Sequence, residues 1–297
     1  MLDVEGKTVI VSGASQGLGR SLALKLHARG ANVVLVARTA SKLQELADSL
    51  NENRMSSNQQ AYAYPLDLSI KEDVLEFGKW LDDRVDNLVG VFCCAGSSIP
   101  KLFTNLSLDE IDNGININYK TCIYLLHVTI PLLKRSKEKT NIVIFSSSVA
   151  FYSFIGYSQY APLKSALQSL GDILRQELDP YNINVSTVFP GNFASEGFHE
   201  ENLTKPAITS QIEGASVPIS VDECADKVLS GITNSESYIH TDFIGWVLSC
   251  FSLGFGPRSW WLFQIPVAVI GVLFARLISK YHDYQVKQWV AANRHKQ

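Results

Sequence analysis

The sequence predicts an α/β fold in which a doubly wound parallel sheet carries helices on both faces. Almost continuously apolar runs of strand length alternate with amphipathic segments of helix length along most of the chain. Continuous apolar strands are typical of parallel sheets covered on both sides, and their alternation with helices is typical of βαβ units. A glycine-rich turn joins the first strand to the first helix, as such folds require.

The expected elements follow one another in a regular order. We expect strands at residues 8–12, 32–37, 61–65, 87–94, 141–145 and 184–189. We expect helices at residues 18–29, 40–50, 72–84, 111–134 and 160–178. The polar stretch 51–60 reads as a surface loop. Residues 192–220 read as a long connection without strong periodicity, and long connections near a site often serve as lids.

Composition narrows the function classes. The chain has 297 residues and a formal net charge of −3, which gives no reason to expect a nucleic-acid partner. The five cysteines are odd in number and lack metal-ligand spacing, so we expect no metal and buried free thiols in a reducing compartment. The N-terminus has neither a basic nor an apolar region of a secretory signal.

An apolar surplus lies at the C-terminus. Residues 243–255 and 260–275 are mostly apolar, and Trp260 and Trp261 resemble an interfacial aromatic anchor. The second run is slightly shorter than the roughly 20 residues of a full span. Basic residues after it would favour a cytosolic C-terminus: Arg276, Lys280, Lys287, Arg294 and Lys296. We expect a membrane-associating segment, and a buried C-terminal helix pair is the alternative.

These patterns divide the chain into two parts. Residues 1–235 form the expected catalytic domain, which contains all the predicted strands. Residues 236–297 form the expected hydrophobic membrane-associating segment with its basic tail.

The turn after the first strand is rich in glycine and leads directly into a helix. Glycines at such a turn let the backbone approach a diphosphate, whose charge is met by the helix N-terminus. This context predicts a Rossmann-type dinucleotide site. The same residues match the G-x-S-x-G elbow of hydrolases, but that elbow normally follows several strands. The residues expected to bind the cofactor here are Gly13, Ser15, Gln16, Gly17 and Gly19.

The end of the second predicted strand indicates which dinucleotide binds. NAD-selective sites usually place an acidic residue there, whereas an Arg accommodates a 2′-phosphate. Arg38 occupies this position, with Lys42 one turn further on, so we expect NADP(H). Asp67 and Leu68 follow the third strand and are expected at the adenine ring. Capping of the next helix is the plain alternative for Asp67.

Three residues of the central chain form a candidate catalytic set. Tyr160 and Lys164 are four residues apart, which places them on one helix face, and Ser147 lies thirteen residues before Tyr160. An ammonium near a phenol favours the phenolate and lowers its pKa. Ser146 and Ser148 flank Ser147, and only the spacing chooses among them. Because proline is tolerated only in the first turn, Pro162 predicts a helix that begins close to Tyr160.

Together these motifs resemble the short-chain dehydrogenase/reductase family over roughly residues 5–232. The family pattern T-G-x-x-x-G-x-G appears with Ser12 in place of Thr. The family's N-A-G segment appears with Cys94 in place of Asn, so the contacts of a structural Asn must be replaced. The resemblance also places family positions on Asn118, Pro190 and Gly191.

The resemblance implies a mechanism. NADPH would deliver a hydride to a ketone carbon while Tyr160 gives a proton to the developing alkoxide. Ser147 would polarise the carbonyl, and Lys164 would lower the Tyr160 pKa and hold the nicotinamide ribose. Asn118 would position a water that links Lys164 to solvent, and a helix hydrogen bond is its alternative. Pro190 and Gly191 would flank the nicotinamide.

Within the family, residues 157–162, 188–193 and 220–225 look similar to fungal 3-ketodihydrosphingosine reductases. This resemblance implies a lipid ketone substrate, 3-dehydrosphinganine, reduced to sphinganine by an enzyme of the endoplasmic reticulum membrane whose catalytic domain faces the cytosol. A membrane-associated short-chain reductase acting on a steroid, retinoid or 3-ketoacyl lipid is the alternative, and a cofactor-binding scaffold without catalysis is another. Helical faces of this fold often pair, so we expect a homo-oligomer.

The 192–220 connection carries four glutamates whose role the sequence leaves open. Such charges could meet a cationic amine, as in a sphingoid base, or form a solvated face. We expect the solvated face for Glu196, Glu200, Glu201 and Glu213.

Overall fold

The computed structural model describes residues 3–214, 217–252 and 261–293, so residues 253–255, Trp260, Arg294 and Lys296 lie outside it. Its centre is a seven-stranded sheet in the order β3-β2-β1-β4-β5-β6-β9, with every pair parallel. The strands are β1 (Thr8–Ser12), β2 (Asn32–Ala37), β3 (Ala61–Pro65), β4 (Leu88–Cys93), β5 (Thr140–Phe145), β6 (Ile183–Phe189) and β9 (Tyr238–His240). The predicted doubly wound fold is confirmed.

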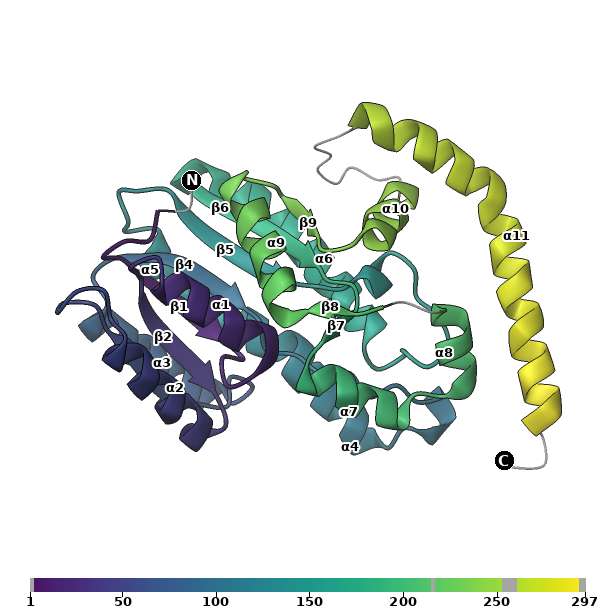
Figure 1. Cartoon of the computed structure of the whole chain (residues 1–297), viewed down its shortest axis with the longest axis horizontal. Helices are drawn as coiled ribbons and strands as arrows, with labels where there is room; N and C mark the ends of the chain where they lie inside the picture. Colours follow the sequence, from purple (N-terminus) through teal and green to yellow (C-terminus); the bar gives the residue numbers. More distant parts are fainter. Residues whose placement is uncertain (1–2, 215–216, 253–260, 294–297) are drawn as a thin grey trace.

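Helices cover both faces of this sheet (Figure 1). One face packs against α1 (Gly17–His27), α2 (Ala40–Glu52) and α9 (Val221–Thr233). The other packs against α3 (Lys71–Arg84), α5 (Thr121–Leu133) and α6 (Ala161–Leu178). Successive residues of β1 enter different cores: Val9 and Val11 enter the first, and Ile10 enters the second. Both faces are therefore apolar, which explains the continuous apolar runs.

The strand order reverses at β1. The chain proceeds from β1 outward through β2 and β3, then crosses back to place β4 on the other side of β1. The connections after β1 and β4 therefore run to opposite sides, which leaves a crevice at the carboxyl ends of these two strands. Open α/β sheets bind their ligands in such a crevice.

The helix expected at 111–134 is divided into three parts. It consists of α4 (Leu108–Ile115), a π-helical turn (Asn116–Lys120) and α5. The helix at 160–178 begins at Ala161, with Pro162 in its first turn, as predicted. π-Helical turns inside helices frequently occur at functional sites, and this one contains Asn118.

Two expectations about the C-terminal half are corrected. Residues 192–220 do not form an irregular connection, because they contain β7 (Phe193–Ala194), α7 (Glu196–Thr204), α8 (Ala207–Glu213) and β8 (Ile219–Ser220). In addition, β9 lies beyond residue 235 and pairs with β6. The sheet therefore continues past the expected domain boundary and ends at His240.

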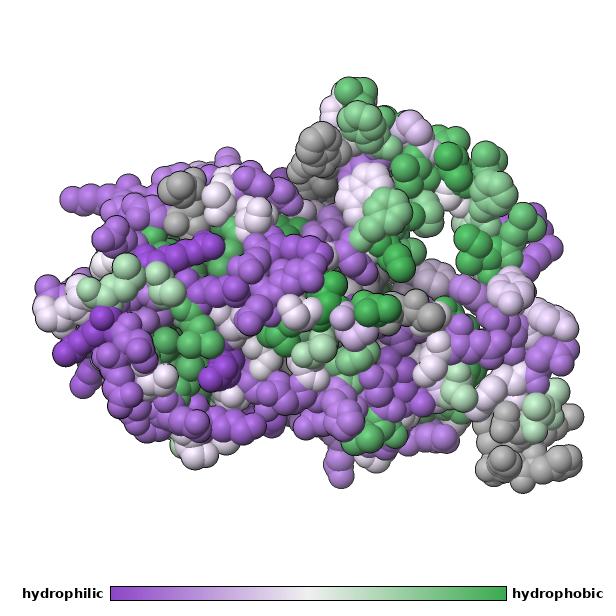
Figure 2. Space-filling model, in the orientation of Figure 1, coloured by the Kyte–Doolittle hydropathy of each residue, from purple (hydrophilic) through white to green (hydrophobic). Residues whose placement is uncertain are grey.

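The chain then leaves the sheet as α10 (Phe243–Phe251) and α11 (Trp261–Asn293). Figure 1 shows α11 as a long helix along one side of the molecule, next to α10 and α8. Over Trp261–Ala292 it is apolar and long enough to cross a membrane, with a mean hydropathy of 2.0 and only 17% of its apolar window buried. This exposure argues against a buried helix pair. Figure 2 shows apolar side chains over α10 and the first half of α11.

Candidate active site

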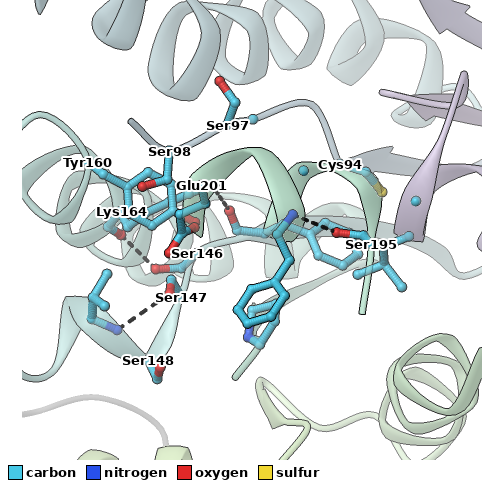
Figure 3. Close-up of a pocket in the computed structure, with 18 of the residues that line it drawn as sticks. Cys94, Ser97, Ser98, Ser146, Ser147, Ser148, Tyr160, Lys164, Ser195 and Glu201 are labelled. Carbon is cyan, nitrogen blue, oxygen red and sulfur yellow. Dashed lines mark hydrogen bonds between the residues drawn. The ribbon is translucent and has the colours of Figure 1, made fainter. Parts of the chain in front are cut away.

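A cavity of about 810 Å³ lies at the carboxyl ends of the central strands (Figure 3). Its walls include most of the residues predicted to bind cofactor or to act in catalysis. Only Lys42 and Asn118 of the predicted set do not line it. The predicted residues that line the cavity are Gly13, Ser15, Gln16, Gly17, Gly19, Arg38, Asp67, Leu68, Ser147, Tyr160, Lys164, Pro190 and Gly191.

The glycine loop has a backbone shape that only glycine permits. Gly13 and Gly17 have φ angles of +66° and +54°, in the left-handed region. A Cβ atom on Gly13 would lie 2.9 Å from the Ala95 amide nitrogen, and one on Gly19 would lie 2.4 Å from the Gly13 carbonyl oxygen. The loop therefore packs against the end of β4 and presents its backbone and the N-terminus of α1 to the cavity.

The ends of β2 and β3 form the adjacent wall. Arg38 faces the cavity, whereas Lys42 donates to the Gln16 side chain at 3.3 Å and supports the glycine loop. The Asp67 carboxylate accepts hydrogen bonds from the backbone and hydroxyl of Ser69 at 2.9 and 2.7 Å. Asp67 thus stabilises the turn before α3 while also lining the cavity.

Replacement contacts compensate for the two departures from the family pattern. The Ser12 hydroxyl accepts a hydrogen bond from the Ala95 amide at 3.2 Å and donates one to the Phe92 carbonyl at 3.3 Å. The segment after β4 is therefore held by Ser12, although Cys94 stands where the family has Asn. On the opposite side, the Gly191 amide donates to the Thr241 hydroxyl at 3.1 Å.

The end of β5 distinguishes the three neighbouring serines. The Ser146 hydroxyl is buried and donates to the Lys164 carbonyl oxygen at 2.7 Å, so it is already engaged. The Ser147 hydroxyl instead forms a side-chain hydrogen bond with Tyr160. Ser147 also caps a short helical turn, accepting from the Val149 amide at 3.4 Å (Figure 3). These contacts favour Ser147 over Ser146, whereas Ser148 also lines the cavity, and the catalytic role of Ser147 stays a prediction.

Lys164 is anchored deep in the site. Its side chain is buried, and Nζ donates to the Phe145 carbonyl oxygen at 2.8 Å. Nζ lies 5.3 Å from the centroid of the Tyr160 ring. The backbone amide of Lys164 also bonds to the Tyr160 carbonyl, at 3.1 Å, in the first turn of α6. The helix start that Pro162 imposes therefore fixes the phenol and the ammonium relative to each other.

Burial dominates the ionisation of both groups. It raises the pKa of Tyr160 well above the usual value, and the charge of Glu201 adds to the increase, whereas the hydrogen bond with Ser147 opposes it. Burial lowers the pKa of Lys164 to about 8, against the influence of the Cys122 and Cys94 thiols. Burial and the Glu201 charge together outweigh the hydrogen bond with Ser147 in setting the Tyr160 pKa. The lowering of this pKa by Lys164 stays a prediction.

Asn118 lies behind this site in the π-helical turn. Its buried amide donates to the carbonyls of Ser97 and Gly114 at 2.8 and 3.2 Å, and its oxygen accepts from the Ser97 amide at 3.1 Å. A Cβ atom on Gly96 would lie 3.0 Å from the Asn118 oxygen and 3.2 Å from Lys164 Nζ. Both side chains therefore converge on Gly96, and the helix hydrogen bond considered as an alternative is present as well.

The far wall contains residues that sequence reasoning missed or misassigned. Glu201 and Glu213 line the cavity with side chains only 17% and 18% exposed, which corrects the expectation of a solvated face for these two. Lys205 pairs with both carboxylates. The spacing of four between Glu201 and Lys205 was the available signal, but the fold of 192–220 was not predicted. Glu196 and Glu200 are exposed, as expected.

The last two helices close the cavity from the side. Ile244, Leu248 and Phe251 of α10 line it together with Ala275 and Ile278 of α11. Further along α11, the His282 ring is hydrogen-bonded to the Tyr152 hydroxyl, which follows Ser147 by one short turn. The predicted membrane-associating segment therefore also contributes an apolar wall to the site.

The fold, the glycine loop and the Ser–Tyr–Lys geometry define a class of protein. Residues 7–206 match the family model described as short chain dehydrogenase. The chain therefore belongs to the short-chain dehydrogenase family.

Within this family, the chain is similar to several named proteins. The chain is 46% identical to the 3-ketodihydrosphingosine reductase TSC10 of Debaryomyces hansenii, covering 96% of this chain and 89% of that protein. It is 35% identical to the protein of the same name from Saccharomyces cerevisiae, covering 98% and 97%. Among solved structures, it is similar to a short-chain dehydrogenase from Sphingobium yanoikuyae in complex with NADPH, with a TM-score of 0.70, 26% identity, and coverage of 80% and 88%.

Proposed function

We propose that this protein reduces 3-ketodihydrosphingosine (3-dehydrosphinganine) to sphinganine with NADPH. The observation that carries the proposal is similarity to relatives named 3-ketodihydrosphingosine reductase over nearly the whole chain, including the C-terminal helices that line the cavity. A cavity with a polar end at Tyr160 and an apolar wall from α10 and α11 suits a ketone on a long alkyl chain.

The residues of the first wall fit NADPH. Gly13 and Gly19 pack closely against neighbouring backbone and line the cavity next to the N-terminus of α1, where a diphosphate would meet backbone amides and the helix dipole. Arg38 lines the same wall, where a guanidinium binds a 2′-phosphate better than it binds a bare ribose. When bound, the cofactor supplies the hydride that reduces the ketone carbon.

Tyr160 is the proposed proton donor. Its raised pKa keeps the phenol protonated near neutral pH, so it holds the proton that a developing alkoxide accepts. Ser147, hydrogen-bonded to Tyr160, is placed to donate to the same oxygen and to stabilise charge as it forms. The proton lost from Tyr160 must then be replaced from the protein side.

Lys164 and Asn118 are proposed to support that replacement. Lys164 lines the cavity with Nζ 5.3 Å from the centroid of the Tyr160 ring, and it would hold the ribose hydroxyls of a bound nicotinamide cofactor. Asn118 holds the backbone of Ser97 and converges with Lys164 on Gly96, which suits a positioning role in a proton path from the solvent. Pro190 and Gly191 are proposed to flank the nicotinamide.

The placement of the protein in the cell is also proposed. The exposed apolar helix α11 suits membrane association. We propose the endoplasmic reticulum membrane with the catalytic domain facing the cytosol, as the resemblance to sphingolipid reductases implies. We place the start of the membrane-associating part after β9, at α10, rather than at residue 236. A homo-oligomer remains a prediction.

The proposal is tested with Tyr160→Phe. Loss of the proton donor is expected to reduce kcat/KM for 3-ketodihydrosphingosine by about 10²- to 10⁴-fold while NADPH binding, followed by fluorescence, is retained. Wild-type protein should prefer this ketone over a steroid ketone, retinal and a 3-ketoacyl thioester. Full activity in Tyr160→Phe would contradict the mechanism, and a stronger reaction with another member of the panel would contradict the substrate.

A further inference from the structure

The cavity wall opposite the glycine loop carries a partly buried network of charged groups. Lys205 has a side chain only 3% exposed and pairs with Glu201 at 3.0 Å and with Glu213 at 2.6 Å. The Tyr157 hydroxyl donates to Glu201 at 2.6 Å, and the Asn192 amide donates to Glu213 at 2.8 Å. Glu201 lies in α7, Lys205 directly follows α7, and Glu213 lies in α8, whereas Tyr157 precedes α6 and Asn192 precedes β7, so the fold assembles the network.

The network does not balance its own charge. Two carboxylates share one ammonium, and the other two partners, Tyr157 and Asn192, are neutral donors. One negative charge is therefore left on a partly buried wall, where it costs free energy unless a cation approaches. The two carboxylates face the cavity, because Glu201 and Glu213 line it and Lys205 does not. The excess negative charge is therefore accessible to a ligand in the cavity.

The excess charge lies close to the proposed proton donor. The rings of Tyr157 and Tyr160 have centroids 6.2 Å apart, and Tyr157 bonds directly to Glu201. The charge of Glu201 acts on the Tyr160 phenol strongly enough to raise its pKa. Ser98 lines the same part of the cavity, and its buried hydroxyl has no hydrogen-bond partner among the residues that the structure describes. Figure 3 shows Ser98, Glu201 and Tyr160 together.

We propose that Glu201 binds the ammonium group of an α-amino ketone, with Glu213 neutralising Lys205. This inference rests on the proposed function, because 3-ketodihydrosphingosine carries its amine on the carbon next to the ketone. One carbon separates the two groups, so an enzyme that places the ketone oxygen at Tyr160 must meet the amine within a few ångströms. Glu201 is the cavity-lining carboxylate whose charge acts on the Tyr160 phenol, and it bonds to Tyr157, whose ring centroid lies 6.2 Å from that of Tyr160.

The test compares two ketones in wild-type protein and in Glu201→Gln. One is 3-ketodihydrosphingosine, and the other is the same molecule without its amino group. Glutamine keeps the acceptor for Tyr157 and leaves Lys205 paired with Glu213, so only the charge is lost. We expect kcat/KM for the amino ketone to fall about 10- to 100-fold, as for loss of a hydrogen bond to a charged group, through KM more than kcat. The value for the amine-free ketone should not decrease.

The controls separate this inference from the proposed function. Glu177→Gln removes the same charge from the exposed face of α6, outside the cavity, and should leave both kcat/KM values unchanged. A wild-type preference for the amino ketone that persists in Glu201→Gln would overturn the amine site alone. Equal losses for both ketones would also overturn it, because they would indicate a structural role. Wild-type protein that reduces neither ketone would overturn the proposed function.

Discussion

The two walls of the cavity are built in different ways. The cofactor wall is formed by one short glycine-rich loop and the ends of adjacent strands, and its shape is enforced by backbone contacts such as Gly19 against the Gly13 carbonyl. The substrate wall is formed by side chains from Tyr157 to Ile278, brought together by helices outside the sheet. The first wall therefore suits a constant ligand, whereas the second can vary with the substrate.

The largest expected effect concerns the outer part of the substrate wall. Val269→Asp combined with Leu273→Asp places two charges on exposed apolar positions of α11. If α11 lies in a bilayer, each charge costs about 3 kcal/mol, so membrane binding should weaken by about 6 kcal/mol. Flotation of the protein with vesicles measures this. Gln288→Asp, on the polar half of α11, is the control, and unchanged flotation of the double variant would show that α11 does not enter the bilayer.

The next effect concerns Lys164, which lies between the two walls, and the pH dependence of the protein's stability. In the folded protein the pKa of Lys164 is about 8 rather than 10.5, so between these values only the unfolded chain holds the proton. The free energy of unfolding should therefore rise with pH across this window, by about 3 kcal/mol for this group. Denaturant unfolding of Lys164→Met should show a smaller rise.

The exposed Lys79→Met provides the matched control for that experiment. It should keep the pH dependence of the wild type, because Lys79 lies on the surface of α3 and outside the cavity. If the free energy of unfolding rose equally with pH in the wild type, Lys164→Met and Lys79→Met, a lowered pKa at Lys164 would be contradicted.

A smaller effect is expected on the cofactor wall. Arg38→Asp replaces the proposed partner of the 2′-phosphate by a repelling carboxylate, which should weaken NADPH binding by about 2 kcal/mol, or roughly 30-fold. NADH binding should change much less. Fluorescence titration with both dinucleotides measures the ratio. Lys42→Asp should have the weaker effect, because Lys42 bonds to Gln16 and does not line the cavity, and the reverse order would contradict the assignment.

The smallest effect tests whether α11 is docked on the catalytic domain. Tyr152→Phe removes one hydrogen bond, to His282, and should cost about 1 kcal/mol. Hydrogen exchange of the α11 amides near His282 should become faster, while exchange in the glycine loop should stay the same. Unchanged exchange at both places would mean that this contact does not hold α11 against the site.

The difference between the cofactor wall and the substrate wall also explains which parts of the site could be predicted from the sequence. Local rules suffice for the glycine loop, for Arg38 at a strand end and for the start of α6 at Pro162, because each depends on backbone geometry over a few residues. The spacing also selected Ser147 from three adjacent serines, and the contacts of Ser146 agree with that choice.

The substrate wall could not be predicted in that way. Whether Glu201 and Glu213 face solvent depends on the packing of α7 and α8, which carry little periodic pattern. The strand β9 is only three residues long, below the length at which alternation is visible. A spacing of four reveals a charge near Tyr160 but not the burial that raises the pKa of this phenol, so the net direction of the shift could not be predicted from the spacing.

Sphinganine formation in membranes shows whether the Tyr160–Lys164 site reduces the lipid ketone. Membranes that contain the wild-type protein or Lys164→Ala are supplied with NADPH and 3-ketodihydrosphingosine, and sphinganine is quantified. We expect sphinganine formation to depend on NADPH. At equal protein level, its rate should be at least 100-fold lower in Lys164→Ala than in the wild type. Equal sphinganine formation by the two proteins, or none by the wild type, would contradict it.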